Sequence, residues 1–125
     1  MKSRHRTTVN RTRHLAAALA FASALLPALA ARAALEWVSC DPIDVATFEN
    51  RIHVRCSASV GGGIFYFARP VTDGAETQRY LSTLLAAQVA GRTLSILTDL
   101  ADTSGAAFGC GASDCRRFEA VSFGN

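Results

Sequence analysis

Residues 73–91, DGAETQRYLSTLLAAQVAG, contain the signals for one complete helix between two strand-like regions. Asp73 is a residue type that accepts backbone N–H bonds at a helix N-cap, and Glu76, three residues later, is placed to reach back to it in a capping box. Gly91 favours the left-handed conformation that ends many helices. The pattern predicts a helix with one apolar side, formed by Leu81, Leu84, Leu85 and Val89.

The first 33 residues have the pattern of a cleavable export signal. Basic residues without any acid precede an apolar run, and small residues follow, with Ala-x-Ala cleavage sites that end at Ala30 and Ala33. The run is shorter than the roughly twenty apolar residues that a membrane-spanning helix needs. We therefore expect a signal peptide over residues 1–33, Sec-dependent export to a periplasmic or secreted location, no membrane insertion, and one mature domain over residues 34–125.

The charge of the chain changes sign once this signal is set aside. Six of the 13 Lys and Arg residues precede Ala34, whereas all 10 Asp and Glu residues follow it. The mature domain therefore has a net charge of about −3 and contains no lysine. Because nucleic acids and anionic membrane surfaces are bound through basic patches, the composition argues against both kinds of partner.

Four cysteines in a mature chain of roughly ninety residues predict disulfide bonds, because exported domains of this size have small cores. Cys40, Cys56, Cys110 and Cys115 allow three pairings. Cys110 and Cys115 enclose only Gly-Ala-Ser-Asp, which favours a local bridge and leaves Cys40 for Cys56. A zinc site is the alternative, but no second close pair of Cys or His accompanies the C-x4-C spacing. We expect two disulfides and neither a metal nor another cofactor.

Short stretches with strand character lie on both sides of the helix. They are residues 43–48, 52–57 and 64–68 before it, and 93–98 and 117–123 after it. Three strands, a helix and two strands are the order of an OB-fold, a small Greek-key barrel. We therefore expect a mainly β, five-stranded OB-like barrel with the helix between the third and fourth strands, and a long loop over residues 99–114. A disulfide-linked α+β sheet is the alternative architecture.

The third of these strands, residues 64–68 (IFYFA), is apolar on both faces. Such a strand must be covered on both sides. The barrel interior covers one side, and either a partner subunit or another segment of the chain covers the other. An apolar outer face around Phe65 and Phe67 would favour a homo-oligomer.

The loop before the last strand carries a resemblance to a known family. The residues concerned are Cys56 and the run from Asp102-Thr103-Ser104-Gly105 through Phe108-Gly109-Cys110 to Asp114-Cys115-Arg116. Over residues 45–123 the chain resembles small exported bacterial proteins related to the B subunits of AB5 toxins, most closely the subtilase-cytotoxin B type. The resemblance implies a ring-forming subunit, usually five-fold, that binds host glycans and carries an enzymatic partner. The segment that helps to form the sugar pocket in that family is short here, so no binding residue is carried over.

Residues suited to catalysis are few. His53 is the only histidine after the export signal, and on the polar face of a strand it is typical of a solvated side chain. Oxidised cysteines are not nucleophiles. Asp99, Asp102 and Asp114 lie in a Gly- and Ser-rich loop and would suit a calcium site or a glycosidase pair, but acids in such loops are typically solvated. We expect no enzymatic activity.

A binding site is better supported by the sequence than a catalytic site, because sugar sites combine an aromatic ring with a few directed polar groups. An arginine can also pair with the carboxylate of an acidic sugar. The candidate ligand-binding residues are Tyr66, Arg79 and Tyr80, with Trp37, Arg116 and Arg117 as further candidates. Each has a structural alternative: packing for the aromatic residues, and solvation or pairing with Asp114 for Arg116 and Arg117.

The sequence therefore favours an exported, non-enzymatic OB-like domain that binds a glycan or a protein partner. If it is toxin-like, it assembles as a homo-oligomer with five subunits. The alternative is a monomeric periplasmic accessory or inhibitor protein of the same fold.

Overall fold

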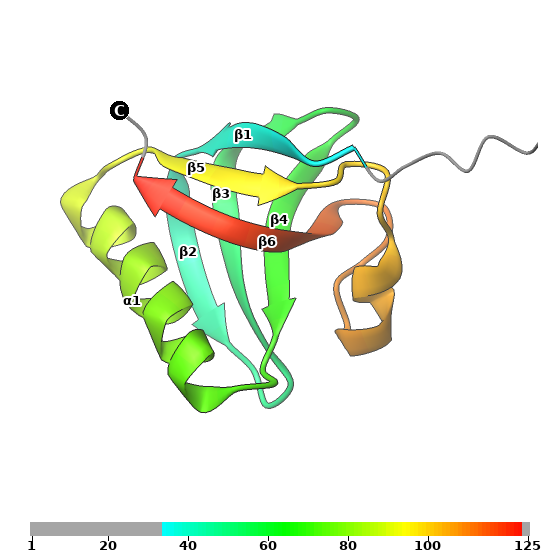
Figure 1. Ribbon diagram of the computed structural model, residues 1–125. Helices are drawn as coiled ribbons and strands as arrows, with labels where there is room; N and C mark the ends of the chain where they lie inside the picture. The colour runs from blue at the N-terminus through cyan, green and yellow to red at the C-terminus, as the bar shows by residue number, and fades with distance from the viewer. Residues whose placement is uncertain (1–33, 124–125) are drawn as a thin grey trace, which may run out of the picture.

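The computed structural model describes residues 34–123, and the predicted signal peptide lies outside these residues. The elements are β1 (Glu36–Cys40), β2 (Pro42–Thr47), β3 (Arg51–Val60), β4 (Ile64–Pro70), α1 (Gly74–Ala90), β5 (Leu94–Thr98), the short 3-10 helix η1 (Ser104–Phe108) and β6 (Cys115–Phe123). The strands form one six-stranded sheet in the order β1-β5-β6-β4-β3-β2 (Figure 1). The β4–β6 pair is parallel and the other pairs are antiparallel.

The chain is mainly β, as predicted, but the five-stranded barrel is wrong in three respects. There are six described strands, α1 lies between the fourth and fifth of them, and the sheet is not closed into a barrel. The additional strand is β1, in which only Cys40 is buried. Its partner is β5, with Glu36 opposite Thr98, so the strand is defined by a distant pairing and not by an alternating local pattern.

Strands β1 and β2 are consecutive in the chain but lie at opposite ends of the sheet order. Only Asp41 separates them, and one residue spans at most about 3.6 Å. The sheet must therefore curl strongly enough to bring its two edges together at this point. The Cys40–Cys56 disulfide joins β1 to β3 there, with the two Cα atoms 5.1 Å apart, which confirms the predicted pairing.

Helix α1 begins and ends where the sequence predicts. The Asp73 carboxylate accepts hydrogen bonds from the backbone N–H groups of Ala75 (2.8 Å) and Glu76 (3.4 Å), and Gly91 has a φ of 59°. The second half of the predicted capping box is wrong. The Glu76 carboxylate pairs instead with Arg69 of β4, at 2.9 Å, because that guanidinium lies against the first turns of the helix.

The predicted apolar side of α1 is only partly buried. Leu84 and Ala87 are buried against the sheet, but Leu85 is 41% exposed and Val89 is 88% exposed. A helix turns about 100° per residue, so Val89 lies roughly 140° around the axis from Leu84. The helix packs mainly against β2 and β6, and the face it presents to them is narrower than the row of leucines in the sequence.

Strand β4 separates two apolar clusters. The main core lies on one side of the sheet and contains Phe67, which has no exposed surface. Ala68 is buried on the other side in a second cluster with Cys110 and Cys115, covered in part by Phe108. Both faces of β4 are thus covered within one chain. The expectation that Phe67 lies on an outer face is wrong, and Phe65, 37% exposed, remains at the surface.

The main core is assembled from β1, β3, β4, β5, β6 and α1. Its fully or almost fully buried members are Cys40, Ile52, Val54, Cys56, Ile64, Phe67, Leu84, Ala87, Leu94, Ile96 and Phe118. Within residues 34–123, no helix is long and apolar enough to cross a bilayer. The two disulfides are consistent with an oxidising, exported environment.

Candidate functional site

A pocket of about 320 Å³ lies between the Cys110–Cys115 loop and the outer face of β3 and β4. It is on the side of the sheet that carries the second apolar cluster, and α1 lies on the opposite side of the molecule (Figure 1). The lining residues are Arg51, His53, Tyr66, Gly109, Cys110, Gly111, Asp114 and Cys115.

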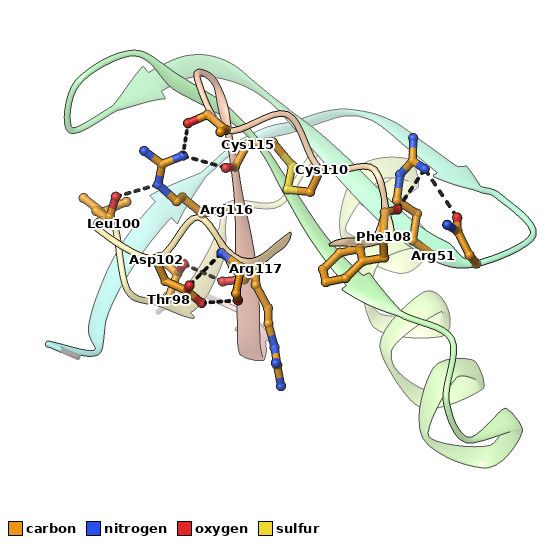
Figure 2. Close-up of a disulfide and its surroundings, with 12 residues drawn as sticks. Arg51, Thr98, Leu100, Asp102, Phe108, Cys110, Cys115, Arg116 and Arg117 are labelled. Carbon is orange, nitrogen blue, oxygen red and sulfur yellow. Dashed lines mark hydrogen bonds between the residues drawn. A yellow bond between two sulfur atoms is a disulfide. The ribbon is translucent and has the colours of Figure 1, made fainter. Parts of the chain in front are cut away.

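The loop that forms one wall of the pocket is fixed by covalent and polar contacts. The Cys110–Cys115 disulfide closes it, as predicted from the spacing. Figure 2 shows Arg116 beside this bridge, where it donates to the carbonyl oxygens of Leu100, Ala112 and Cys115. The wall therefore keeps its shape without a ligand, as most small-molecule sites do.

Arg51 connects this loop to the start of β3. Its Nη1 donates to the carbonyl oxygen of Phe108 (3.2 Å) and to the side chain of Asn50 (3.4 Å), as seen in Figure 2. The guanidinium carbon lies 4.0 Å from the centroid of the Phe48 ring, a cation–π contact. A Cβ atom on Gly109 would lie 2.6 Å from Nη1, so the glycine allows the loop to approach Arg51 closely.

His53 lies between two aromatic rings, with centroid distances of 4.8 Å to Phe48 and 5.7 Å to Tyr66. Burial, and secondarily the positive charge of Arg51, lower the pKa of His53, while Asp44 acts in the opposite direction. The imidazole makes no hydrogen bond to another described residue. It is therefore a neutral group at neutral pH, with one donor and one acceptor nitrogen available.

Asp114 ends the loop and fixes its position on β4. Its carbonyl oxygen accepts from the backbone N–H groups of Phe65 (2.9 Å) and Tyr66 (3.0 Å). Its carboxylate makes no hydrogen bond or ion pair within residues 34–123. The expected alternative, a pairing of Asp114 with Arg116 or Arg117, does not occur, since Arg116 binds carbonyl oxygens and Arg117 pairs with Glu119.

Of the three candidate ligand-binding residues, Tyr66 lines the pocket and the other two lie on α1. Tyr80 packs edge-on against Phe118, with centroids 5.4 Å apart, and its hydroxyl donates to the carbonyl oxygen of Glu119 at 2.9 Å. Arg79 is exposed on the helix surface. The structure therefore does not bring Tyr66, Arg79 and Tyr80 together. Trp37, 56% exposed on β1, is not part of the pocket either.

The acidic residues of the loop have different roles. Asp99 accepts from the backbone N–H of Ala101, and Asp102 accepts from both the backbone and the hydroxyl of Ser104. The bonds from Ser104 lower the pKa of Asp102. These two acids stabilise local turns, and only Asp114 lines the pocket. Within the described part of the chain, no group of three acidic, histidine or cysteine side chains is arranged to hold a metal ion.

The sequence reasoning missed Arg51, His53 and Asp114 as members of one site. The sequence pattern is typical of solvated side chains for His53 and Asp114, and Arg51 immediately precedes the strand predicted over residues 52–57. The available signal was the Gly-Cys-x4-Cys loop, whose closure brings Asp114 onto β4. Comparison with known proteins adds nothing to this assignment, because no family model, curated protein or solved structure matches the chain.

Proposed function

We propose that this chain is an exported, non-enzymatic binding domain that holds a glycan in the pocket between the Cys110–Cys115 loop and β3–β4. The observation that carries the proposal is the placement of Tyr66 beside two polar side chains without hydrogen-bond partners, His53 and Asp114. Tyr66 and His53 lie on β4 and β3, and Asp114 belongs to the loop closed by the Cys110–Cys115 disulfide. An aromatic surface with a few directed polar groups, in a preformed hollow, is the usual design of a small-ligand site.

The composition of the lining supports binding over nucleophilic catalysis. It contains neither Ser nor Thr, and both of its cysteines are in the disulfide. His53 therefore has no Ser, Thr or free Cys nucleophile to activate among the lining residues. These groups serve instead as hydrogen-bond donors and acceptors for a bound hydroxylated molecule.

The test is glycan binding by the oxidised protein, first on an array and then by titration of the best ligand. We expect Tyr66→Ala to weaken binding by roughly tenfold or more, equivalent to about 1.4 kcal/mol. Arg79→Ala is the matched control, because Arg79 was also a candidate but lies outside the pocket. Equal affinity of the two variants, or the absence of any glycan ligand, would contradict the proposal.

We also propose that the fold is an open relative of the OB barrel. Strands β1 and β2, separated only by Asp41, would act as the two halves of one bent first strand. The parallel β4–β6 pair and the position of α1 immediately after β4 support this relationship. Measured strand pairings in which β1 did not lie beside β5, or β2 did not lie beside β3, would exclude this relationship to the OB barrel.

The resemblance to toxin B subunits adds a proposal about assembly. A subunit of that type would form a ring, and the exposed Phe65 on β4 is the candidate contact that the sequence indicates. Light scattering during size exclusion measures the mass of the oxidised protein directly. We expect a mass near five chains, reduced by Phe65→Asp. A monomer would limit the resemblance to the fold and favour the periplasmic accessory alternative.

A further inference from the structure

The pocket contains one cationic group, Arg51, and the orientation of that group limits what it can bind. One side of its guanidinium lies against the Phe48 ring, and its Nη1 lies close to Gly109 and already donates to Phe108 and Asn50. Its Nε is buried and has no hydrogen-bond partner. Two-pronged recognition of a carboxylate needs two adjacent, accessible N–H groups of the guanidinium. One possible pair includes Nη1, which already donates, and the other includes Nε, which is buried.

The pocket also contains a negative charge. The Asp114 carboxylate has no cationic partner among residues 34–123, since Arg116 and Arg117 are committed elsewhere. Among the lining residues, only Arg51 could offset that charge for an anionic ligand, because Arg55, whose guanidinium carbon lies 5.8 Å from the Tyr66 ring centroid, is outside the lining. A carboxylate without a partner is, in contrast, a strong acceptor for two hydroxyl groups of a ligand.

The remaining polar groups carry no charge. The pKa of His53 is lowered, so its imidazole is neutral near pH 7 and offers one donor and one acceptor. The Tyr66 phenol likewise makes no hydrogen bond to a described residue, and its ring provides an apolar surface. The volume of about 320 Å³ is at the lower end of the roughly 300–1,000 Å³ found for ligand sites, the size suited to a single ring.

We infer that the pocket takes an uncharged, hydroxyl-rich ring, a neutral monosaccharide unit, with Asp114 accepting hydrogen bonds from its hydroxyl groups and Tyr66 packed against its apolar face. The inference rests on the proposed glycan-binding function and specifies the class of sugar. It excludes acidic sugars, although the arginines of the sequence pointed towards them.

The experiment compares pairs of sugars that differ only at C6, where the acidic member has a carboxylate in place of the hydroxymethyl group, such as galactose with galacturonic acid and glucose with glucuronic acid. Binding to the oxidised, isotope-labelled protein is followed by the chemical shifts of the Tyr66, His53 and Asp114 amides near neutral pH. We expect at least one neutral sugar to shift these amides, and its acidic counterpart to bind at least about tenfold more weakly. This comparison needs no variant and is unaffected by folding defects.

The role of Asp114 is tested with Asp114→Asn, and Glu36→Gln, an exposed carboxylate on β1, is the matched control. We expect Asp114→Asn to weaken the affinity for the neutral sugar at least about tenfold. The substitution should also reduce the difference in affinity between the neutral sugar and its acidic counterpart. Glu36→Gln should change neither.

The outcomes distinguish a failure of the inferred sugar class from a failure of the proposed glycan-binding function. If acidic sugars shift the pocket amides as strongly as neutral ones, or if Asp114→Asn binds the neutral sugar normally, the inference is overturned while the proposed function stands. If no sugar of either kind shifts these amides, the proposed glycan-binding function is itself overturned.

Discussion

Gly109 occupies a position at which a side chain would strain the backbone and collide with Arg51. Its φ is 89°, and a Cβ atom there would lie 2.6 Å from Arg51 Nη1. Gly62, in the turn between β3 and β4, has a similar φ of 81° but open space around it. The two glycines therefore separate the cost of backbone strain from the cost of a lost contact.

We expect Gly62→Ala to lower the free energy of unfolding by about 1 kcal/mol, the cost of a left-handed alanine. Gly109→Ala should cost more, because Arg51 must also move away from Phe108. Urea denaturation of both variants measures the difference, and ligand titration shows whether the pocket is affected. Equal losses in the two variants would mean that Arg51 adapts without cost.

His53 is the residue whose protonation links the pocket to pH. Its pKa is lowered by burial and by Arg51, from an ordinary value of 6.5. The unfolded chain therefore binds a proton more readily than the folded chain as pH falls through this range. Protonation of His53 thus favours unfolding, and the stability it removes is regained as pH rises.

We expect the free energy of unfolding to decrease as pH falls below about 6.5 and to continue to decrease towards the lower pKa of the folded state. His53→Gln should flatten this dependence between about pH 5 and 7, above the range where carboxylates titrate. Urea midpoints at several pH values provide the measurement. The same slope in the variant as in the parent protein would assign the dependence to other groups.

The two disulfides act on different elements. Cys40–Cys56 holds β1 against β3 in the main core, with a sequence separation of 16. Cys110–Cys115 closes a loop with a separation of 5 and forms the wall of the pocket. The longer loop removes more conformational freedom from the unfolded chain, whereas the shorter one shapes the candidate site.

We expect the double variant Cys110→Ala/Cys115→Ala to lose about 2 kcal/mol of stability, and Cys40→Ala/Cys56→Ala about 3 kcal/mol, from the chain-entropy relation. Ligand binding should show the opposite order, with the larger loss in the loop variant. Denaturation and glycan titration of both proteins test this pair of results. Retained binding without the loop disulfide would show that Arg51 and Arg116 hold the loop by themselves.

The whole molecule consists of a curled sheet with an apolar cluster on each side of β4. The buried residues of the main cluster come from β1, β3, β4, β5, β6 and α1, whereas the second cluster contains only Ala68 and the loop disulfide, with Tyr66 and Phe108 packed against them. The larger cluster therefore supplies most of the free energy of folding, and the smaller one fixes the candidate site on the sheet.

We expect Phe67→Ala to lower the free energy of unfolding by about 3–5 kcal/mol, the usual cost of deleting a fully buried ring. Phe108→Ala should cost less, because Phe108 is only partly buried, but it should weaken ligand binding. Thermal denaturation and glycan titration separate the two effects. A larger loss of stability for Phe108→Ala would reverse this assignment of the clusters.

The sequence by itself determined the features whose signals lie within a few residues of one another. Asp73 and Gly91 define the ends of α1, because a capping residue bonds to the adjacent turn of the helix. The alternation of apolar and polar residues from Ile52 to Cys56 is also a local pattern, and it defines a strand. The Cys110–Cys115 bridge was predicted from its spacing, and Cys40–Cys56 was the pair that remained. The aromatic candidate Tyr66 was placed on a strand, but its neighbours were not.

Only the tertiary structure decided the features that join distant parts of the chain. Strand β1 exists through its pairing with β5, and α1 turns Leu85 and Val89 outward because the sheet contacts a different side of the helix. The pocket forms where Arg51 meets Phe108, which is 57 residues away, and where Asp114 is bound to β4. Hydrogen bonds across such separations depend on how the sheet curls, and no local pattern encodes that curvature.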